Sequence, residues 1–196
     1  MKIGVIGIGM LGEAIVLNLL NLGQDVAVYN RTKEKTMRVE NNGAKVMDSP
    51  KAVAENAELV IIVVKDAIAV REVSFGEKGI VESKNKKPII ADMSTIDAEE
   101  SKRIADEFQR NDIKKIEIPV MGGPNVAITG KLVMMVSGPK SSFDYCKPIF
   151  EKIANKILFL GEQGIANSIN LAMNLQITML ALTLSEGITL LKKLNV

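Results

Sequence analysis

The sequence predicts an α/β protein with a Rossmann-like, doubly wound and mostly parallel sheet, followed by a long connecting helix. Two observations support this fold class. Short runs rich in valine and isoleucine alternate with amphipathic segments, which is the order of a parallel sheet covered by helices on both faces. In addition, the first of these runs leads directly into a glycine-rich turn and then into a helical pattern.

Six segments are expected to be strands: residues 2–6, 25–29, 59–64, 88–92, 115–120 and 132–136. The first helix is predicted over residues 11–22, with Gly23 as its C-terminal cap. A second, over residues 97–110, is charged on one face and carries Ile104 and Phe108 on the other. Ligands of such sheets bind beyond the carboxyl ends of the strands, so functional residues should directly follow strands.

The residues from Gln163 to Ser185 carry no charged side chain and are expected to form one long helix. A membrane span would suit this composition. However, Asn167, Asn170 and Asn174 recur at spacings of three and four residues and form a polar stripe on one helical face. We therefore expect no membrane span but a helix that is buried nearly all round, with its stripe facing a cleft. The sequence therefore predicts a Rossmann domain over residues 1–162 and, over residues 163–196, a long helix that begins an all-α domain.

Composition limits the partners and the location of the protein. The 25 Lys and Arg residues nearly balance the 23 Asp and Glu residues, which argues against nucleic acid and anionic membranes and favours a small-molecule partner. Cys146 is the single cysteine and cannot form an internal disulfide, and no secretory leader is visible, so we expect a cytoplasmic protein. Histidine is absent, so we expect no metal site.

The glycine-rich turn has the spacing of a dinucleotide-binding motif, G-x-G-x-x-G, between a strand and a helix. Gly7 permits a tight turn, Gly9 lets the backbone approach a pyrophosphate, and Gly12 lets the helix pack close to the strand. The helix start at Met10 and Leu11 offers free N–H groups to the phosphates. We therefore predict that these five residues bind a dinucleotide.

The second predicted strand is followed by Asn30, Arg31 and Thr32, where an NAD-specific fold usually has an acidic residue for the ribose 2′-hydroxyl. A guanidinium group and a hydroxyl suit a 2′-phosphate instead, so the sequence predicts that the Rossmann domain binds NADP(H). In the alternative interpretation, Asn30 and Thr32 only cap a helix and Arg31 is a solvated surface charge.

Taken together with four further motifs, these residues resemble the β-hydroxyacid dehydrogenase family. That family includes 3-hydroxyisobutyrate dehydrogenases, glyoxylate or succinic semialdehyde reductases and, more distantly, 6-phosphogluconate dehydrogenases. The further motifs are FGEKG at 75–79, DMSTI at 92–96, PVMGG at 119–123 and the glycine pair at 161 and 164. The resemblance implies an NADP-dependent enzyme that acts on CH–OH donors, with a helical C-terminal domain that begins at the long helix.

The resemblance also implies roles for individual residues. Thr95 is expected near the nicotinamide, and the substrate-binding residues are expected to be Ser94, Met121, Gly122, Gly123 and Asn174. From the fold itself, Val64 ends the predicted strand 59–64 and Lys65 directly follows it, at the place where nicotinamide-binding residues lie.

Two departures from the family pattern affect the expected chemistry. Met121 stands where the family usually has serine, which weakens carboxylate recognition. Asn170 stands where the family has its catalytic lysine, and an amide does not readily give up a proton.

Three interpretations of Asn170 remain open. Lys65 could replace the missing lysine as proton donor, or be a solvent-facing loop lysine. The substrate could be an imine, since imine reductases resemble this family, use NADPH and lack the lysine. Finally, the chain could bind NADP without catalysis, either as a regulator or as an impaired variant.

The long helix is also predicted to be an interface. Family members continue for on the order of 100 further residues, so we expect either a truncated form or a tight dimer. In a homodimer, the side chains buried between subunits would be Leu171, Leu175, Met179 and Leu182.

Overall fold

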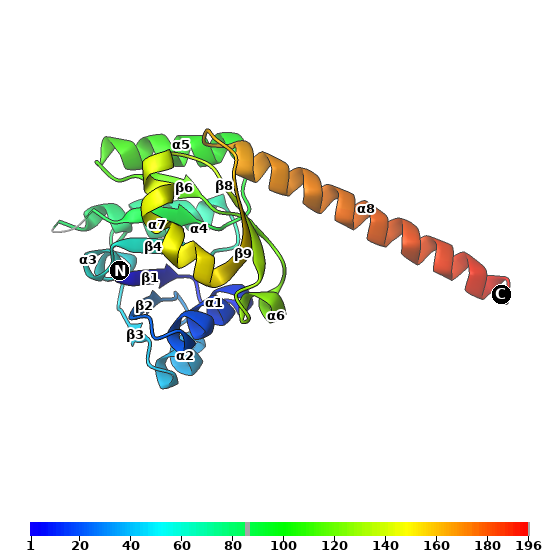
Figure 1. Cartoon of the computed structure of the whole chain (residues 1–196), viewed down its shortest axis with the longest axis horizontal. Helices are drawn as coiled ribbons and strands as arrows, with labels where there is room; N and C mark the ends of the chain where they lie inside the picture. Colours follow the sequence, from blue (N-terminus) through cyan, green and yellow to red (C-terminus); the bar gives the residue numbers. More distant parts are fainter. Residues whose placement is uncertain (85–86, 196) are drawn as a thin grey trace.

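The computed structural model describes residues 1–84 and 87–195. Its centre is a six-stranded, wholly parallel sheet with the strand order β3-β2-β1-β4-β5-β6 (Figure 1). This order reverses direction between β1 and β4, as in a doubly wound dinucleotide-binding fold. The strands are β1 (Ile3–Ile6), β2 (Val26–Tyr29), β3 (Lys45–Val46), β4 (Leu59–Ile62), β5 (Ile89–Asp92) and β6 (Lys115–Glu117).

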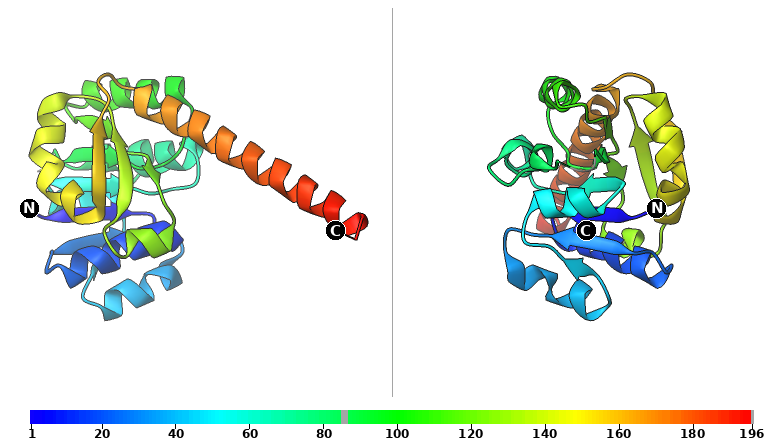
Figure 2. Two further views of the ribbon diagram at one scale, coloured as in Figure 1. Left: turned by 45° about the vertical axis from the view of Figure 1, so that its right-hand side comes forward. Right: turned by 90° about the vertical axis from the view of Figure 1, so that its left-hand side faces the viewer.

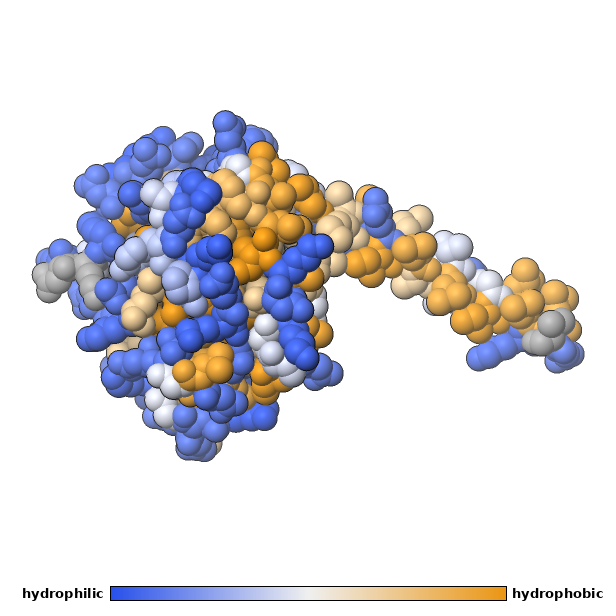
Figure 3. Space-filling view, in the orientation of Figure 1, coloured by the Kyte–Doolittle hydropathy of each residue, from blue (hydrophilic) through white to orange (hydrophobic). Residues whose placement is uncertain are grey.

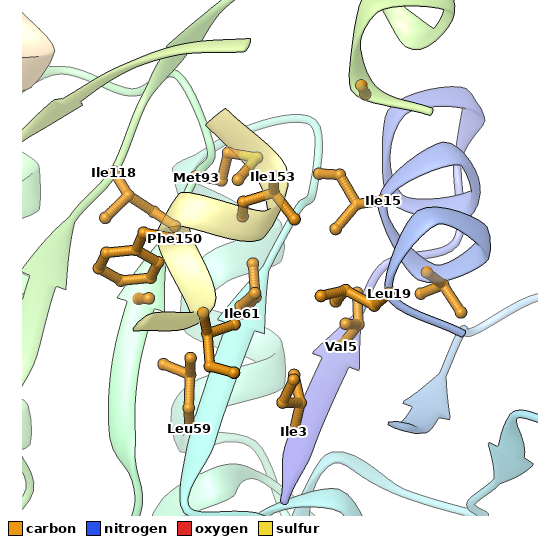
Figure 4. Packing of buried hydrophobic residues seen from close by; sticks show 14 of the residues in the cluster. Ile3, Val5, Ile15, Leu19, Leu59, Ile61, Met93, Ile118, Phe150 and Ile153 are labelled. Atoms are coloured by element: carbon orange, nitrogen blue, oxygen red, sulfur yellow. The ribbon is translucent and has the colours of Figure 1, made fainter. Parts of the chain in front are cut away.

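Both faces of this sheet are buried, because successive side chains of a strand point to opposite faces. Leu59 and Ile61 of β4 lie in one apolar cluster, whereas Val60 and Ile62 lie in the other. Figure 4 shows the first cluster, in which Ile3, Val5, Leu59 and Ile61 of the sheet lie among side chains of α1 (Met10–Asn21) and α7 (Lys140–Ile153).

The remaining helices of the body are η1 (Lys33–Thr36), α2 (Met37–Asn41), α3 (Pro50–Asn56), α4 (Ala67–Phe75), η2 (Ile80–Glu82), α5 (Ala98–Arg110) and α6 (Pro124–Ala127). The predicted first helix is confirmed as α1, and Gly23 follows its end with φ 71°, the left-handed conformation that a glycine cap provides. The predicted helix 97–110 is confirmed as α5, with Asp97 as its N-cap.

A second, three-stranded sheet continues the chain: β7 (Val120–Met121), β8 (Leu132–Val136) and β9 (Ala154–Phe159). β7 and β8 are antiparallel, whereas β8 and β9 are parallel. The prediction of one strand over residues 115–120 was therefore wrong. The chain leaves the large sheet after Glu117 and joins the small one at Val120, with Pro119 between them, where a missing N–H interrupts strand pairing.

The long helix α8 (Ile165–Lys193) extends away from the body (Figures 1 and 2). The expectation of burial nearly all round was wrong for this chain, since the buried residues of α8 are Ala166, Asn167 and Asn170, all in its first turns. Apolar side chains line the remainder (Figure 3). Among the described residues, α8 is the one helix long and apolar enough to cross a membrane by length and composition alone.

Candidate functional site

The glycine turn joins β1 to α1, and its three glycines meet different surroundings. A Cβ on Gly7 would lie 2.1 Å from the Val63 carbonyl oxygen, and one on Gly12 would lie 2.0 Å from the Gly7 carbonyl oxygen. A Cβ on Gly9 would meet no atom within 4 Å. The fold itself therefore requires Gly7 and Gly12, whereas Gly9 leaves an open cradle that fits a pyrophosphate.

The start of α1 supplies hydrogen-bond donors to this cradle. The Glu13 N–H donates to the Gly9 carbonyl at 2.8 Å, so the N–H groups of Met10, Leu11 and Gly12 precede the first intrahelical bond of α1. Together with the positive end of the helix dipole, they form a site for phosphate oxygens.

Asn30, at the end of β2, braces the turn. Its Oδ1 accepts the Ile8 N–H at 2.9 Å, and its Nδ2 donates to the Thr32 carbonyl at 2.7 Å. Asn30 therefore positions the glycine turn and the loop after β2. The sequence does not show this role, because the Ile8 N–H is twenty-two residues away from Asn30.

A cleft of about 450 Å³ lies between the glycine turn, the end of β2 and α4. The predicted residues that line it are Gly7, Gly9, Asn30, Arg31, Thr32, Val64 and Lys65. Lys35 and Lys78 also line the cleft and were not predicted, although a lysine in the turn after Thr32 is a visible charge signal. Arg31, Thr32 and Lys35 give this end of the cleft the chemistry that a phosphate requires.

Lys65 lies in this cleft and pairs with its neighbour Asp66, with 3.0 Å between Nζ and Oδ2. Asp66 caps α4 by accepting the Ala69 N–H at 2.8 Å. That backbone bond, followed by the Lys65 side chain, lowers the pKa of the Asp66 carboxyl. Asp66 is therefore a carboxylate near neutral pH and holds the Lys65 ammonium beside it.

A separate polar cluster forms where α8 crosses the carboxyl end of β5. The Thr95 hydroxyl donates to Asn170 Oδ1 at 3.1 Å, and Asn174 Nδ2 donates to the same oxygen at 3.1 Å. Asn170 Nδ2 lies 3.4 Å from both the Val120 carbonyl oxygen and Met121 Sδ. The structure thus brings together Thr95, Met121, Asn170 and Asn174, while Lys65 lies in the cleft described above.

Ser94, Gly122 and Gly123, which were predicted to bind substrate, lie in the loops that follow β5 and β7. The Ser94 hydroxyl accepts the Val64 N–H at 3.1 Å, and its own N–H donates to Asp92 Oδ1 at 3.0 Å. Ser94 therefore ties the loop after β5 to the loop after β4. Gly122 has φ 119°, and a Cβ on Gly123 would meet no atom within 4 Å, so the backbone at Gly123 is open to close approach.

Two buried charged groups at this edge of the sheet were missed by sequence reasoning. Glu117 is fully buried and accepts the Ser137 hydroxyl at 2.6 Å, the Gly164 N–H at 2.9 Å and the Asn167 N–H at 3.3 Å. The carboxylate thereby caps the N-terminus of α8, where the helix dipole favours negative charge. It positions the helix that carries Asn170.

The second group is the ammonium of Lys115, which donates to Ser101 Oγ at 2.8 Å and lies 3.4 Å from Asp92 Oδ2. Both charged side chains are fully buried. The ion pair places a positive charge beside the carboxylate that holds Ser94, although Asp92 Oδ2 itself accepts no hydrogen bond.

Cys146 is a buried thiol and is not part of this site. Burial raises the pKa of the Cys146 thiol to about 12, so it stays protonated near neutral pH. Within residues 1–84 and 87–195, no cluster of three or more Cys, Asp or Glu side chains could hold a metal ion.

Comparison with known proteins identifies the family to which the dinucleotide-binding region is similar. Residues 2–161 match the family model described as the NAD binding domain of 6-phosphogluconate dehydrogenase. The oxidoreductase YfjR of Bacillus subtilis is 33% identical over 98% of this chain and 68% of its own length. Glyoxylate/succinic semialdehyde reductase 1 of Arabidopsis thaliana is 31% identical over 98% of this chain and 67% of its own length.

Two solved structures have the same fold. Psf3, in complex with NADP+ and 2-OPP, is 27% identical with a TM-score of 0.85, over 94% of this chain and 68% of its own. The 3-hydroxyisobutyrate dehydrogenase of Mycobacterium tuberculosis, 24% identical with a TM-score of 0.88, covers 99% of this chain and 66% of its own.

Proposed function

This chain belongs to the family of the NAD-binding domain of 6-phosphogluconate dehydrogenase, within the β-hydroxyacid dehydrogenase group, and from that premise we propose that it is an NADP(H)-dependent oxidoreductase. The proposed reaction moves a hydride between nicotinamide and a small hydroxyacid or aldehyde acid, of the 3-hydroxyisobutyrate, glyoxylate or succinic semialdehyde type. We further propose that it acts in the cytoplasm.

One observation carries the cofactor proposal. Arg31, Thr32 and Lys35 line the same cleft as Gly9, and the two residues that directly follow β2 are Asn30 and Arg31, neither of them acidic. A guanidinium group forms paired hydrogen bonds with phosphate oxygens. The complex of Psf3 with NADP+ supports the same choice of cofactor.

The bound nicotinamide would supply the hydride, and the residues of the chain would hold and polarise the carbonyl. The Asn170 amide can donate a hydrogen bond to a carbonyl oxygen, and so can the Thr95 hydroxyl once it releases Asn170 Oδ1, but neither is an acid of suitable strength. Proton transfer would then come from Lys65 or from ordered water. Asp66 Oδ2 lies 3.0 Å from Lys65 Nζ and holds this side chain at the edge of the cleft.

A second candidate function, imine reduction, is favoured by the pair Asn170 and Met121. An iminium carbon accepts hydride with less need of a general acid, and the Met121 thioether next to Asn170 Nδ2 makes the pocket less suited to a carboxylate.

The experiment is a fluorescence titration with NADPH and NADH, followed by turnover with glyoxylate, succinic semialdehyde and a cyclic imine. We expect NADPH to bind more tightly and an aldehyde acid to be reduced. Turnover of the imine alone would select the second candidate. Tight NADPH binding without turnover of any substrate would favour a binding protein without catalysis, and absence of dinucleotide binding would contradict the proposal.

A further inference from the structure

Glu72 of α4 faces the proposed phosphate site from the opposite wall of the cleft. Its Oε2 lies 3.8 Å from Arg31 Nη1, and both residues line the 450 Å³ cleft. The two side chains are 61% and 77% exposed, so their pairing contributes little to folding stability. The position of this ion pair in the cleft is the important feature, because the Arg31 guanidinium group is also the proposed ligand of the cofactor 2′-phosphate.

The surroundings of Glu72 leave its charge directed at Arg31. The preceding residue, Arg71, lies 3.2 Å from Glu100 and 2.6 Å from Glu107 of α5, so it is committed elsewhere. In the part of the chain that the structure describes, Arg31 is the ion-pair partner of Glu72. These contacts with α5 and the Asp66 cap also fix α4, so Glu72 can withdraw only by turning its side chain.

The 3.8 Å distance limits how far a bound phosphate can lie from this carboxylate. An oxygen that accepts a hydrogen bond of about 2.9 Å from Arg31 Nη1 lies no farther than about 6.7 Å from Glu72 Oε2. That is shorter than the Debye length of about 8 Å at physiological ionic strength, so salt does not remove the repulsion. A phosphate monoester carries nearly two negative charges at neutral pH, which doubles the effect.

We infer that Glu72 is a specificity-determining residue, which competes with the 2′-phosphate for Arg31 and holds the preference for NADPH over NADH below what Arg31, Thr32 and Lys35 alone would give. NADH has an uncharged 2′-hydroxyl at this position, so Glu72 does not penalise it. The inference rests on the proposed dinucleotide-binding function and adds a residue to its cofactor selection.

The test is the Glu72→Gln variant, which keeps the shape of the side chain and removes its charge. Dissociation constants for NADPH and NADH are measured by fluorescence titration at about 0.05 M and 1 M salt. At low salt we expect the Kd for NADPH to fall about three- to tenfold and that for NADH to change less than about twofold. At 1 M salt, where the Debye length is about 3 Å, most of the gain should disappear.

Glu151→Gln is the matched control. Glu151 is an exposed residue of α7 that pairs with Lys147, and its replacement removes the same charge without touching the cleft. We expect both constants to stay unchanged in this variant. An equal gain in Glu151→Gln would assign the effect to net charge and overturn the inference.

Three further results would overturn it: an unchanged NADPH constant in a folded Glu72→Gln protein, an equal gain for NADH, or a loss of NADH affinity that marks Glu72 as a ribose ligand. Glu72→Ala also removes the carboxylate, so it must likewise lower the dissociation constant for NADPH; an unchanged or higher constant would overturn the inference. Wild-type protein that binds neither dinucleotide would instead overturn the proposed function itself.

Discussion

The three glycines of the turn differ in what a side chain would displace, and this difference can be tested. Gly9→Val should fold normally, because Gly9 has φ −86° and a Cβ there meets no atom of the chain. The valine side chain should nevertheless fill the space for the pyrophosphate, so binding of both NADPH and NADH should be lost. Thermal unfolding and dinucleotide titration provide the two measurements.

Gly12→Ala is the matched contrast to Gly9→Val. Its Cβ would lie 2.0 Å from the Gly7 carbonyl oxygen, so the turn or the helix must shift, and a loss of about 1–3 kcal/mol in stability is expected. Full dinucleotide affinity in folded Gly9→Val protein would show that the turn has a structural role only.

Arg31→Ala tests the choice of cofactor. Removing a charge-assisted phosphate contact should weaken NADPH binding by about 1.5–3 kcal/mol and leave NADH binding nearly unchanged. An equal loss for both cofactors would contradict the assignment of Arg31 to the 2′-phosphate. In the double variant with Glu72→Gln, the gain expected from Glu72→Gln should shrink, because the two residues act on the same phosphate.

Asn170→Lys tests the missing general acid. Asn170 stands where the family pattern has its catalytic lysine and lies beside the Thr95 hydroxyl, so we expect a lysine amine placed here to reach the reacting carbonyl. We expect kcat/KM for hydroxyacid formation to rise by about 10²-fold or more, the usual contribution of a general acid. No gain in Asn170→Lys, together with lost activity in Lys65→Met, would identify Lys65 as the donor.

The parts of the site that could be predicted are those formed within a few residues of chain. The glycine turn and residues 30–32 each follow a strand, so local pattern and known spacing place them. Glu117 and Lys115 could not be predicted, because a charged residue in a short strand is normally read as solvent-exposed. Their partners Ser137, Gly164 and Asp92 are distant in sequence and meet them only in the folded chain.

Among the secondary-structure elements, the attachment of α8 depends on Glu117. Glu117→Ala would leave the Gly164 and Asn167 N–H groups and the Ser137 hydroxyl without their buried acceptor. Losing these bonds should cost about 2–4 kcal/mol, measured by urea unfolding, and should raise amide hydrogen exchange in residues 164–170.

Ser137→Ala serves as the comparison that keeps the carboxylate. It removes one of the three bonds to Glu117 and also the acceptor of the Ala166 N–H, so a loss of about 1–3 kcal/mol is expected. Unchanged exchange at the start of α8 in Glu117→Ala would mean that the other contacts of the helix, such as the hydrogen bond between Thr95 and Asn170, hold it without Glu117.

The secondary-structure elements that could not be predicted from the sequence are too short to show a periodicity, or lack the usual sequence signals at their interior or ends. β3 has two residues, too few for any periodicity. α7 contains Pro148 in its interior, which normally argues against a helix, and β9 follows α7 directly without a turn. The alternation of β9 is also weak, since Asn155 and Lys156 are adjacent and both exposed.

At the scale of the whole molecule, most of α8 is exposed in the single chain. The helix has 29 residues and is about 44 Å long, yet it is buried only at Ala166, Asn167 and Asn170. Leu171, Leu175, Met179 and Leu182 recur at spacings of three and four and are all exposed in the single chain. A continuous apolar stripe of this length is rare on soluble monomers.

We propose that a second copy of the chain covers this stripe, because a twofold axis pairs the same helical face with itself. Light scattering at micromolar concentration should therefore give a dimer, or larger aggregates. Met179→Glu together with Leu175→Glu should shift the population toward monomer, because each dimer would bury four unpaired carboxylates. Leu184→Glu adds the same charge to an exposed position on the opposite face of α8 and should leave the dimer intact. A stable wild-type monomer would contradict the proposal, since the stripe would then be tolerated in water.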